Sequence, residues 1–406
     1  MVVQHNLQAM NANRMLNITT GSQSKSAEKL SSGYRINRAA DDAAGLSISE
    51  KMRKQIRGLD QASTNAEDGV SAVQTAEGAL TEVHSMLQRM NELAVQASNG
   101  TNSQTDRDAI QSEIDQLTTE IDRVAETTKF NETYLLKGDA NGATKKIYLE
   151  AHDAGLKGKL TDNGDGTATF VMDELKAGDS VTIAGKSYTI GSTKAEVEAE
   201  FTKQVTKKDD KFTVNGKEIT IVDTHVGDAD AEKAAGKYTT DEAKALITEG
   251  STVKFANGTT MKAMTGADDG VDDNDSSVIS KNKAYLLASE ELLKANQIGD
   301  TEGNAAVTDT KKAPISLTNG DGTFKINLAQ TEVAEKLNFN LHVGSDADMT
   351  NKINVNIETM SSSYLGIKGL NVSDDTGVAA TYAVDAIADA LQKVSDQRSS
   401  LGAVQN

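Results

Sequence analysis

The two ends of this chain carry long apolar stripes at helical spacing, whereas residues 145–338 between them consist of turn signals and short strand-like runs. Helices that are distant in sequence, carry matching stripes and have no other apolar partner tend to pack on each other. The pattern therefore predicts an α+β multidomain protein with a long coiled-coil-like helical bundle built from both chain ends. The middle of the chain is expected to form an inserted β-rich outer domain.

The apolar stripe is weakest at the N-terminus, where Asn and Gln interrupt it. The apolar residues that approach one helical face there are Val3, Leu7, Met10 and Leu16. An isolated helix with so little apolar area is marginal in water. We therefore expect residues 1–44 to form a separate arm that folds only against a partner.

Three stronger helices are predicted to build the bundle, which comprises residues 45–144 and 339–406 and includes a small hairpin. The first helix runs from about residue 42 to a turn at Asn99-Gly100, and the second, starting near Thr105 or Asp106, folds back antiparallel on it. The third helix is C-terminal. Their apolar positions recur at steps of three and four residues: Met52, Ile56, Leu59, Ala66, Val70, Val73, Ala76, Leu80, Val83, Leu87, Met90, Ala94 and Ala97 in the first; Ile110, Ile114, Leu117, Ile121 and Val124 in the second; Val384, Ile387, Leu391, Val394 and Leu401 in the third.

Residues 145–338 are expected to form one or two β-rich subdomains. Hairpins are predicted at Asn215-Gly216, Asn257-Gly258 and Ala184-Gly185, and short helices at 195–205, 241–247 and 285–295. Asn-Gly is typical of a two-residue type I′ turn, which needs positive φ at both positions. The string NGDGT precedes a strand-like run twice, at Asn163–Thr167 and Asn319–Thr323, which indicates a repeated turn.

Charge and composition exclude several classes of protein. The formal net charge of −18 argues against a nucleic-acid partner, because phosphate contacts need a basic face. Cys is absent, which excludes a disulfide framework and thiol chemistry. No stretch approaches the ~18 apolar residues of a membrane-spanning helix, and the first residues show no Sec-type signal. We therefore expect no membrane insertion.

No catalytic or metal-binding constellation is visible, so the sequence predicts no enzyme activity, no metal site and no cofactor. The histidines are scattered, without ligand partners at helical or hairpin spacing: His5, His84, His152, His225 and His342. GxSxG, P-loop and dinucleotide-binding motifs are absent. Residues 267–277 are rich in Asp but lack EF-hand spacing, and we interpret them as a solvated acidic loop rather than a calcium site.

Several long strings resemble a known family. SSGYRINRAADDAAGLSISEKMR (Ser31–Arg53), LQRMNELAVQASNGTNSQTDRDAIQSEIDQL (Leu87–Leu117) and DRVAETTKFN (Asp122–Asn131) are similar to the N-terminal part of bacterial flagellin. SDQRSSLGAVQN (Ser395–Asn406) is similar to its C-terminal part, preceded by the flagellin-like LHVGSDAD (Leu341–Asp348). The resemblance covers roughly residues 1–140 and 340–406, and it does not extend to residues 145–338.

The resemblance implies a structural subunit of the bacterial flagellar filament, which serves motility. Flagellins are secreted unfolded through the flagellar export apparatus with the help of an export chaperone, and they assemble with other flagellin subunits outside the cell. In this family the N-terminal arm and the extreme C-terminus line a central channel. The long helices build the surrounding tube, and the middle of the chain projects outward.

The resemblance also suggests where the family's C-terminal helix would continue. In flagellins the string SDQRSSLGAVQN lies partway along that helix, whereas this chain stops at Asn406 without a helix stop signal. The expectation is a truncated form whose N-terminal arm is disordered without its partner. Such a chain is expected to stay monomeric and to form no filaments.

Flagellins are also ligands of the flagellin-sensing Toll-like receptor of animal innate immunity. The resemblance implies that Arg89 and Leu93, within LQRMNELAVQ, and Glu113, within IQSEIDQL, are receptor-binding residues. Helical position alone favours a simpler interpretation, with Arg89 and Glu113 on a solvated face and Leu93 in or at the edge of the core. The match of both motifs favours the receptor patch.

Other classes of protein stay open at this point. A hook–filament junction protein shares the helical ends, although the near-continuous match of Leu87–Leu117 favours flagellin. An extracellular helical adhesin would show the same periodicity without these strings. An enzymatic insert is the weakest alternative, because residues 145–338 contain no catalytic constellation.

Overall fold

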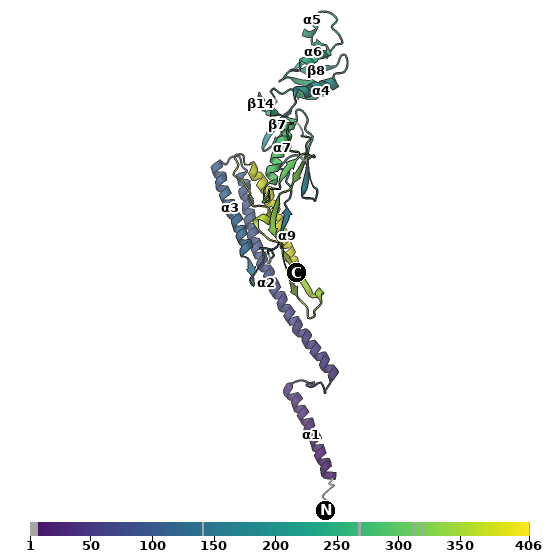
Figure 1. Ribbon diagram of the computed structural model, residues 1–406, viewed down its shortest axis with the longest axis vertical. Helices are drawn as coiled ribbons and strands as arrows, with labels where there is room; N and C mark the ends of the chain where they lie inside the picture. Colours follow the sequence, from purple (N-terminus) through teal and green to yellow (C-terminus); the bar gives the residue numbers. More distant parts are fainter. Residues whose placement is uncertain (1–6, 140–141, 267–268, 312, 318–319, 406) are drawn as a thin grey trace, which may run out of the picture. The chain divides into compact units, whose positions relative to one another are not determined.

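The structure is a computed structural model that describes residues 7–139, 142–266, 269–311, 313–317 and 320–405 (Figure 1). It divides into two compact units. The first contains the chain up to Val73 together with Asn338–Val355, and the second contains Gln74–Leu337 together with Asn356–Val404. Val3, His5 and Asn406, which entered the sequence-based predictions, lie outside the described residues.

The first unit contains helix α1 (Leu7–Ser32), which continues well beyond Leu16, the last apolar position of the predicted N-terminal helical face. None of the residues of α1 is buried. Its apolar side chains therefore gain nothing from packing within this chain, and the dependence of the arm on a partner stays a prediction.

A hairpin of β18 (Leu337–His342) and β19 (Lys352–Ile357) packs on the first half of α2 (Ala43–Ala97) in the same unit. Residues without large side chains permit this close approach. A Cβ added at Gly69 would lie 2.2 Å from Leu341 Cδ1, and one at Gly58 would lie 3.0 Å from the Cα of Ser345. The Asn65 amide donates to the His342 carbonyl oxygen at 2.9 Å, so a polar contact fixes the hairpin along the helix.

The second unit contains the rest of α2, α3 (Gln104–Thr127) and α9 (Val378–Gln405), as predicted for a bundle of helices from both chain ends. Figure 1 shows α3 beside the C-terminal half of α2. From Val73 onward most predicted stripe positions are buried, whereas Leu117, Val124, Val384 and Leu391 are only partly so. In the first half of α2 the prediction of buried positions was wrong, because apolar spacing alone does not supply a partner that covers the face. Met52, Ile56 and Leu59 are 56–58% exposed, and Ala66 and Val70 are only partly buried. The stripe of α9 is made of smaller residues than expected, because many of its buried positions are Ala: Ala380, Tyr382, Ala383, Ala386, Ile387, Ala390, Val394, Gln397 and Leu401.

The β-rich part of the second unit consists of several small sheets. Two-stranded sheets pair β1 (Lys129–Phe130) with β2 (Thr133–Tyr134) and β3 (Thr144–Tyr148) with β17 (Gln330–Ala334). A four-stranded sheet has the order β15 (Ala306–Thr308), β16 (Thr323–Asn327), β5 (Thr167–Met172), β4 (Gly158–Asp162). A second has the order β13 (Val271–Asp272), β14 (Asp275–Ser280), β7 (Lys186–Gly191), β6 (Ser180–Ile183). A five-stranded sheet has the order β10 (Lys237–Tyr238), β9 (Lys217–Ile221), β8 (Lys211–Val214), β11 (Thr252–Phe255), β12 (Thr260–Lys262). The shorter helices are α4 (Lys194–Gln204), α5 (Ala229–Ala234), α6 (Thr240–Ala245), α7 (Lys281–Asn296) and α8 (Ser362–Leu365).

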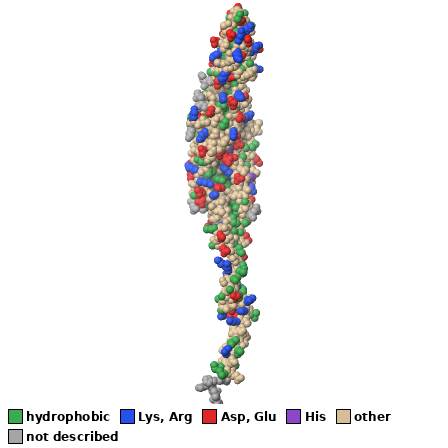
Figure 2. All heavy atoms as spheres, turned by 90° about the vertical axis from the view of Figure 1, so that its right-hand side faces the viewer, with side chains coloured by type: hydrophobic (Ala, Val, Ile, Leu, Met, Phe, Trp, Pro, Cys, Tyr) green, Lys and Arg blue, Asp and Glu red, His purple; other side chains and the backbone are tan. Residues whose placement is uncertain are grey.

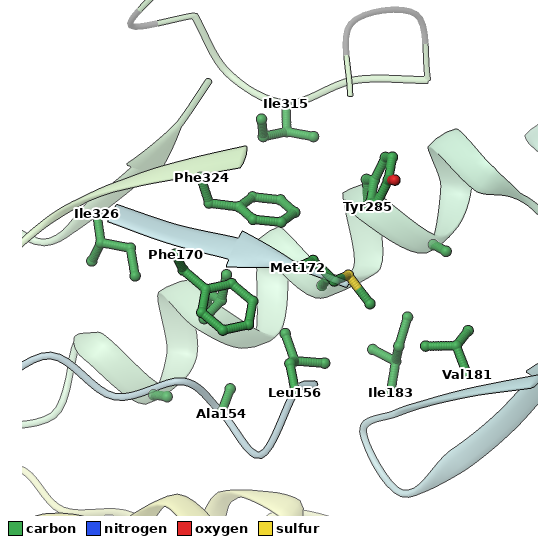
Figure 3. Close-up of a cluster of buried hydrophobic side chains, with 14 of the residues drawn as sticks. Ala154, Leu156, Phe170, Met172, Val181, Ile183, Tyr285, Ile315, Phe324 and Ile326 are labelled. Atoms are coloured by element: carbon green, nitrogen blue, oxygen red, sulfur yellow. The ribbon is translucent and has the colours of Figure 1, made fainter. Parts of the chain in front are cut away.

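Two separate apolar cores stabilise this β-rich part. In the first, α7 packs against the two four-stranded sheets, and Figure 3 shows Tyr285, Phe170 and Phe324 facing one another there. Tyr382 of α9 belongs to the same core. The second core lies between the five-stranded sheet and helices α4 and α6. In it the rings of Phe201 and Phe212 are in edge-to-face contact, with their centroids 5.2 Å apart.

The predicted hairpins are confirmed, but one turn differs in type. Asn215 and Gly216 have φ of 49° and 82° between β8 and β9, as a two-residue type I′ turn requires. At Asn257-Gly258 only the glycine has positive φ, and the Phe255 amide donates to the Thr259 carbonyl at 2.9 Å. The loop is therefore longer than two residues. The Asn257 side chain accepts the Thr259 amide, and the backbone of Asn257 does not adopt the left-handed conformation.

The predicted short helices correspond to α4, α6 and α7. The first NGDGT string forms the turn between β4 and β5, where the Asp165 carboxylate accepts the Thr167 amide at 3.1 Å. In the second string Asn319 lies outside the described residues, and Asp321 accepts the Thr323 amide at 2.9 Å in the same way.

The interpretation of residues 267–277 as a solvated acidic loop was wrong in part, because strands β13 and β14 run through this segment. Ala267 and Asp268 lie outside the described residues, but Asp272 is buried at the β13–β14 turn. Its carboxylate accepts the backbone amides of Thr265 and Asn274 at 3.0 Å and of Asp275 at 3.1 Å. Burial alone would raise the pKa of Asp272, and these hydrogen bonds instead hold it below its usual value.

Candidate functional site

The structure brings two of the three predicted site residues together on neighbouring helices. Arg89 of α2 donates from Nε and Nη2 to Glu113 Oε1 of α3, both at 2.9 Å. A further contact joins Arg89 Nη1 to Glu92 Oε2 at 3.2 Å. The hydrogen bonds from Glu113 and then Glu92 raise the pKa of Arg89. The Arg89 and Glu113 side chains are 49% and 45% exposed, so the pair is accessible to a partner.

Leu93 lies elsewhere, because its side chain is only 2% exposed. It is buried on α2 with Met90 and Ala94, inside the core. The leucine is therefore not available as a surface contact on this single chain. What α2 and α3 present to solvent here is a network of one guanidinium and two carboxylates.

The turn between α2 and α3 determines which residues of the two helices meet. Ser103 and Asp106 form a capping box that starts α3, and the hydrogen bonds from Ser103 lower the pKa of Asp106. Arg107 is 3% exposed and donates to the carbonyl oxygens of Ala97 at 2.9 Å and Asn99 at 3.2 Å. The start of α3 is thus tied to the end of α2, which places Glu113 opposite Arg89.

A second group of polar contacts ties α3 to the chain before α9. Arg107 Nη1 donates to the Asp375 carbonyl at 3.1 Å, and Gln111 exchanges hydrogen bonds with Leu370 and Val372 at 3.0 and 2.7 Å. Asp122 accepts the amide and hydroxyl of Ser362 at 2.7 and 2.8 Å. Sequence reasoning missed these residues because isolated polar positions leave no periodic pattern.

A different surface lies on the first half of α2. Ile48, Met52, Ile56 and Leu59 are 56–58% exposed, and their spacing of four, four and three residues places them on one helical face. Helix α1 likewise exposes Leu7, Met10, Met15, Leu16, Ile18 and Leu30. Figure 2 shows hydrophobic side chains along this exposed stretch of α2. We call the four α2 residues the α2 stripe.

A cleft of about 430 Å³ opens between the end of α7 and the start of α9. Two of its charged groups are paired with each other, since Glu291 is 6% exposed and accepts from Lys294 Nζ and from Tyr382 Oη, both at 2.7 Å. A third, Asp374, accepts the Val378 amide through Oδ2 at 3.1 Å, and its buried Oδ1 has no hydrogen-bond partner among the described residues. Burial raises the pKa of Tyr382 far above its usual value, and the Glu291 carboxylate adds to this rise. The tyrosine is therefore a hydrogen-bond donor here and not a base.

Within the described ranges, no cluster of His, Asp and Glu side chains has the geometry of a metal site. A helix of sufficient length and apolarity to span a membrane was likewise not found in the part of the chain that the structure describes.

Comparisons with known proteins identify relatives of this chain. Residues 3–141 match the family model described as the bacterial flagellin N-terminal helical region. A flagellin of Clostridium tyrobutyricum is 36% identical over 411 aligned positions, which cover all of this chain and 85% of that protein. A flagellin of Halalkalibacterium halodurans is 62% identical over 136 residues, which cover 34% of this chain and 50% of that protein.

Among solved structures the similarity is more distant. FliC of Burkholderia pseudomallei is 18% identical, with 83% of this chain and 99% of that chain covered and a TM-score of 0.28. The flagellar junction protein FlgL of Legionella pneumophila is 15% identical, with 88% and 97% covered and a TM-score of 0.32.

Proposed function

Because the chain belongs to the flagellin family and is a structural subunit of the bacterial flagellar filament, we propose that copies whose residues 1–44 have their helical partner assemble through the α2 stripe and the exposed face of α1. In this proposal residues 1–44 line a channel, residues 45–144 with 339–406 build the tube, and residues 145–338 face outward. The chain acts by assembly and performs no catalysis. Its place of action is the extracellular filament that serves motility.

The exposed α2 stripe is the observation that carries the assembly proposal. Its four large apolar side chains lie on one face of a helix, and each exposes more than half of its surface. Contiguous exposed apolar surface on a soluble protein marks an interaction site. The hairpin that covers α2 in the same unit contacts Gly58, Asn65 and Gly69, and it leaves the stripe free.

The test places a charge in the stripe and compares it with a charge at an exposed position of α2 outside the stripe. Ile56→Asp and the control Thr64→Asp are introduced into the gene in its own bacterium. We expect Ile56→Asp to be secreted at normal levels but to give short or absent filaments by electron microscopy, whereas Thr64→Asp swims normally. Full-length filaments built from Ile56→Asp would refute the role of the stripe.

We also propose that the chain leaves the cell unfolded through the flagellar export apparatus, escorted by an export chaperone. The absence of Cys and the single Pro support this route, since neither disulfides nor many slow proline isomers restrain the unfolded chain. The exposed helix α1 supplies an apolar surface that a chaperone is able to cover before assembly.

As a second function we propose recognition by the flagellin-sensing Toll-like receptor through Arg89 and Glu113. The observation that favours it is the half-exposed ion pair that these residues form across α2 and α3. Leu93 then contributes as the buried packing beneath the patch.

Arg89→Ala is expected to weaken binding to the receptor ectodomain by ~1 kcal/mol or more, without a change in helicity. The matched control is Arg123→Ala, which removes another exposed Arg–Glu pair of α3, with Glu120. Surface plasmon resonance measures both variants. Equal affinities for wild type and Arg89→Ala would exclude the patch, and an equal loss in both variants would indicate a general charge effect.

A further inference from the structure

The segment that connects β9 to β10 in the five-stranded sheet is held in place, between its two ends, mainly by charged side chains. Figure 1 shows its helix α5 beside α6 at the end of this sheet. No residue of α5 is buried, and Val226 before it is 87% exposed. The segment is anchored at both ends, because Thr220 donates to Gly236 and Val222 to Tyr238 at 2.8 and 2.9 Å. Between these anchors, apolar burial contributes little to its position.

His225 is the centre of this segment, and its side chain is only 14% exposed. Nδ1 lies 2.7 Å from Glu232 Oε2 of α5, and Nε2 lies 2.8 Å from Glu242 Oε2 of α6. An ionised carboxylate only accepts hydrogen bonds, so both ring nitrogens must carry protons. The geometry therefore requires an imidazolium that bridges the two helices.

The surrounding charges keep both carboxylates ionised. Glu242 also accepts from Lys233 Nζ at 2.8 Å and from the Thr239 amide at 3.1 Å. With Lys233 as the largest cause and His225 the next, these contacts lower the pKa of Glu242 to about 2. Glu232 accepts from His225 and from the Val226 amide, and its pKa is lowered as well.

Charges farther from the ring do not change this assignment. Lys237 of β10 acts on Glu232, and Asp230 of α5 acts on Lys233. A metal ion is a poor alternative, because the two ring nitrogens point to different carboxylates on opposite sides of the imidazole. One ion is unable to reach both pairs.

We propose that His225 is a protonation-dependent clasp, which closes residues 222–235 onto α6 and releases them when the imidazole loses its proton. A neutral imidazole has one donor and one lone pair, so one of the two carboxylates then faces a lone pair at hydrogen-bond distance. Repulsion separates that pair, and no buried apolar side chain of α5 holds the segment in place. The clasp changes which surface the end of the outer domain presents as the external pH changes.

The direction of the pH effect follows from the two kinds of shift. Hydrogen bonds from Glu242 and then Glu232 raise the pKa of His225 above 6.5, so its stabilisation is complete below 6.5 and is lost as the pH rises through the raised value. The carboxylates have lowered pKa values, so their stabilisation is lost only in strong acid. The clasp is thus closed from mildly acidic pH up to the raised pKa of His225.

The test combines NMR titration with hydrogen exchange on the whole chain. Long-range ¹H–¹⁵N spectra should show both His225 ring nitrogens protonated at pH 6.5, with an apparent pKa above 6.5. Amide exchange of residues 222–235, corrected for intrinsic rates, should accelerate at least ~10-fold between about pH 6 and about pH 9. Glu232→Gln should lower the pKa of His225 and shift that transition to lower pH.

Two variants separate the clasp from a general loss of structure. His225→Gln should exchange fast in this segment at every pH, whereas the control His342→Gln should keep the wild-type pH transition. A pKa of His225 at or below 6.5, or equal protection of the segment at both pH values, would overturn the proposal. Zn²⁺ that binds stoichiometrically at His225 and restores protection at high pH would overturn it too, in favour of a metal site.

Discussion

Arg107 is predicted to be the most consequential single polar residue of the helical core. Its guanidinium is 3% exposed and donates to three carbonyl oxygens, those of Ala97, Asn99 and Asp375, at 2.9, 3.2 and 3.1 Å. Hydrogen bonds that involve a charged group contribute ~1.5–3 kcal/mol each. The charge also lies at the C-terminal end of α2, where a cation adds ~0.5–1 kcal/mol.

Truncation to Ala does not cost the full sum of these contributions. Asn99 and Asp375 are themselves exposed, so water replaces part of what the guanidinium supplied to their carbonyls. We therefore expect Arg107→Ala to lower the free energy of unfolding by ~2–4 kcal/mol. The free energy of unfolding of Arg107→Lys should lie between those of the wild type and Arg107→Ala, because an ammonium lacks the planar fork that reaches several carbonyls at once.

Urea unfolding followed by circular dichroism at the helical band measures this loss. The matched control is Arg123→Ala, whose guanidinium is exposed and pairs with Glu120 on the same helix, so it should cost ~1 kcal/mol or less. Because Arg107 also sets which residues of α2 and α3 meet, its loss should weaken any binding that depends on Arg89 and Glu113. A loss below ~1 kcal/mol for Arg107→Ala would refute the reasoning that this turn depends on the buried guanidinium.

Three further predictions concern other parts of the chain. Gly78→Ala should raise the free energy of unfolding by up to ~1 kcal/mol, because the added Cβ meets open space on a helix. Gly69→Ala should not give this gain, because its Cβ would lie 2.2 Å from Leu341. Limited proteolysis of the hairpin and thermal unfolding measure the difference. Phe201→Ala should cost ~3–5 kcal/mol in the core of the five-stranded sheet and leave the helical transition unchanged, as tyrosine fluorescence and circular dichroism followed together would show. Burial raises the pKa of Asp389, so the folded chain binds a proton at this carboxylate more readily than the unfolded chain does. The ionised carboxylate therefore opposes folding above its raised pKa. Asp389→Asn should raise the temperature of the unfolding midpoint at pH 7, and less so near pH 4.

The sequence predicted the regular elements well because their signals are local and repeated. Steps of three and four residues identified the long helices, and Asn215-Gly216 identified a type I′ turn whose two positive φ values the structure contains. The turn at Asn257 failed for a local reason too: its side chain accepts a backbone amide, which the dipeptide alone does not reveal. The apolar pattern did not reveal the extension of α1 from Leu16 to Ser32, because mostly polar exposed residues continue the helix there.

The candidate site was less predictable, because it depends on which side of a helix faces a neighbour. The pairing of Arg89 with Glu113 required knowing how α3 lies against α2, and single polar residues of the turn decide that. Leu93 differs from the apolar stripe by one position, yet it is as buried as Met90. The buried face of α2 is therefore wide enough to include the adjacent positions Leu93 and Ala94, whereas a strict seven-residue repeat describes a narrower face.

The polar contacts of α3 explain how a bundle with few large side chains acquires a defined register. Aromatic residues make up 4% of the chain, and four of the nine buried residues of α9 are Ala. Small, similar side chains pack almost equally well after a shift of one turn, so apolar burial alone specifies the alignment of such helices weakly. Arg107, Gln111 and Asp122 each bind a backbone group or side chain more than 200 residues away, and each leaves buried polar groups unsatisfied if the helices slide. We therefore infer that apolar stripes bring the two ends of the chain together, whereas these three polar residues decide how they are aligned.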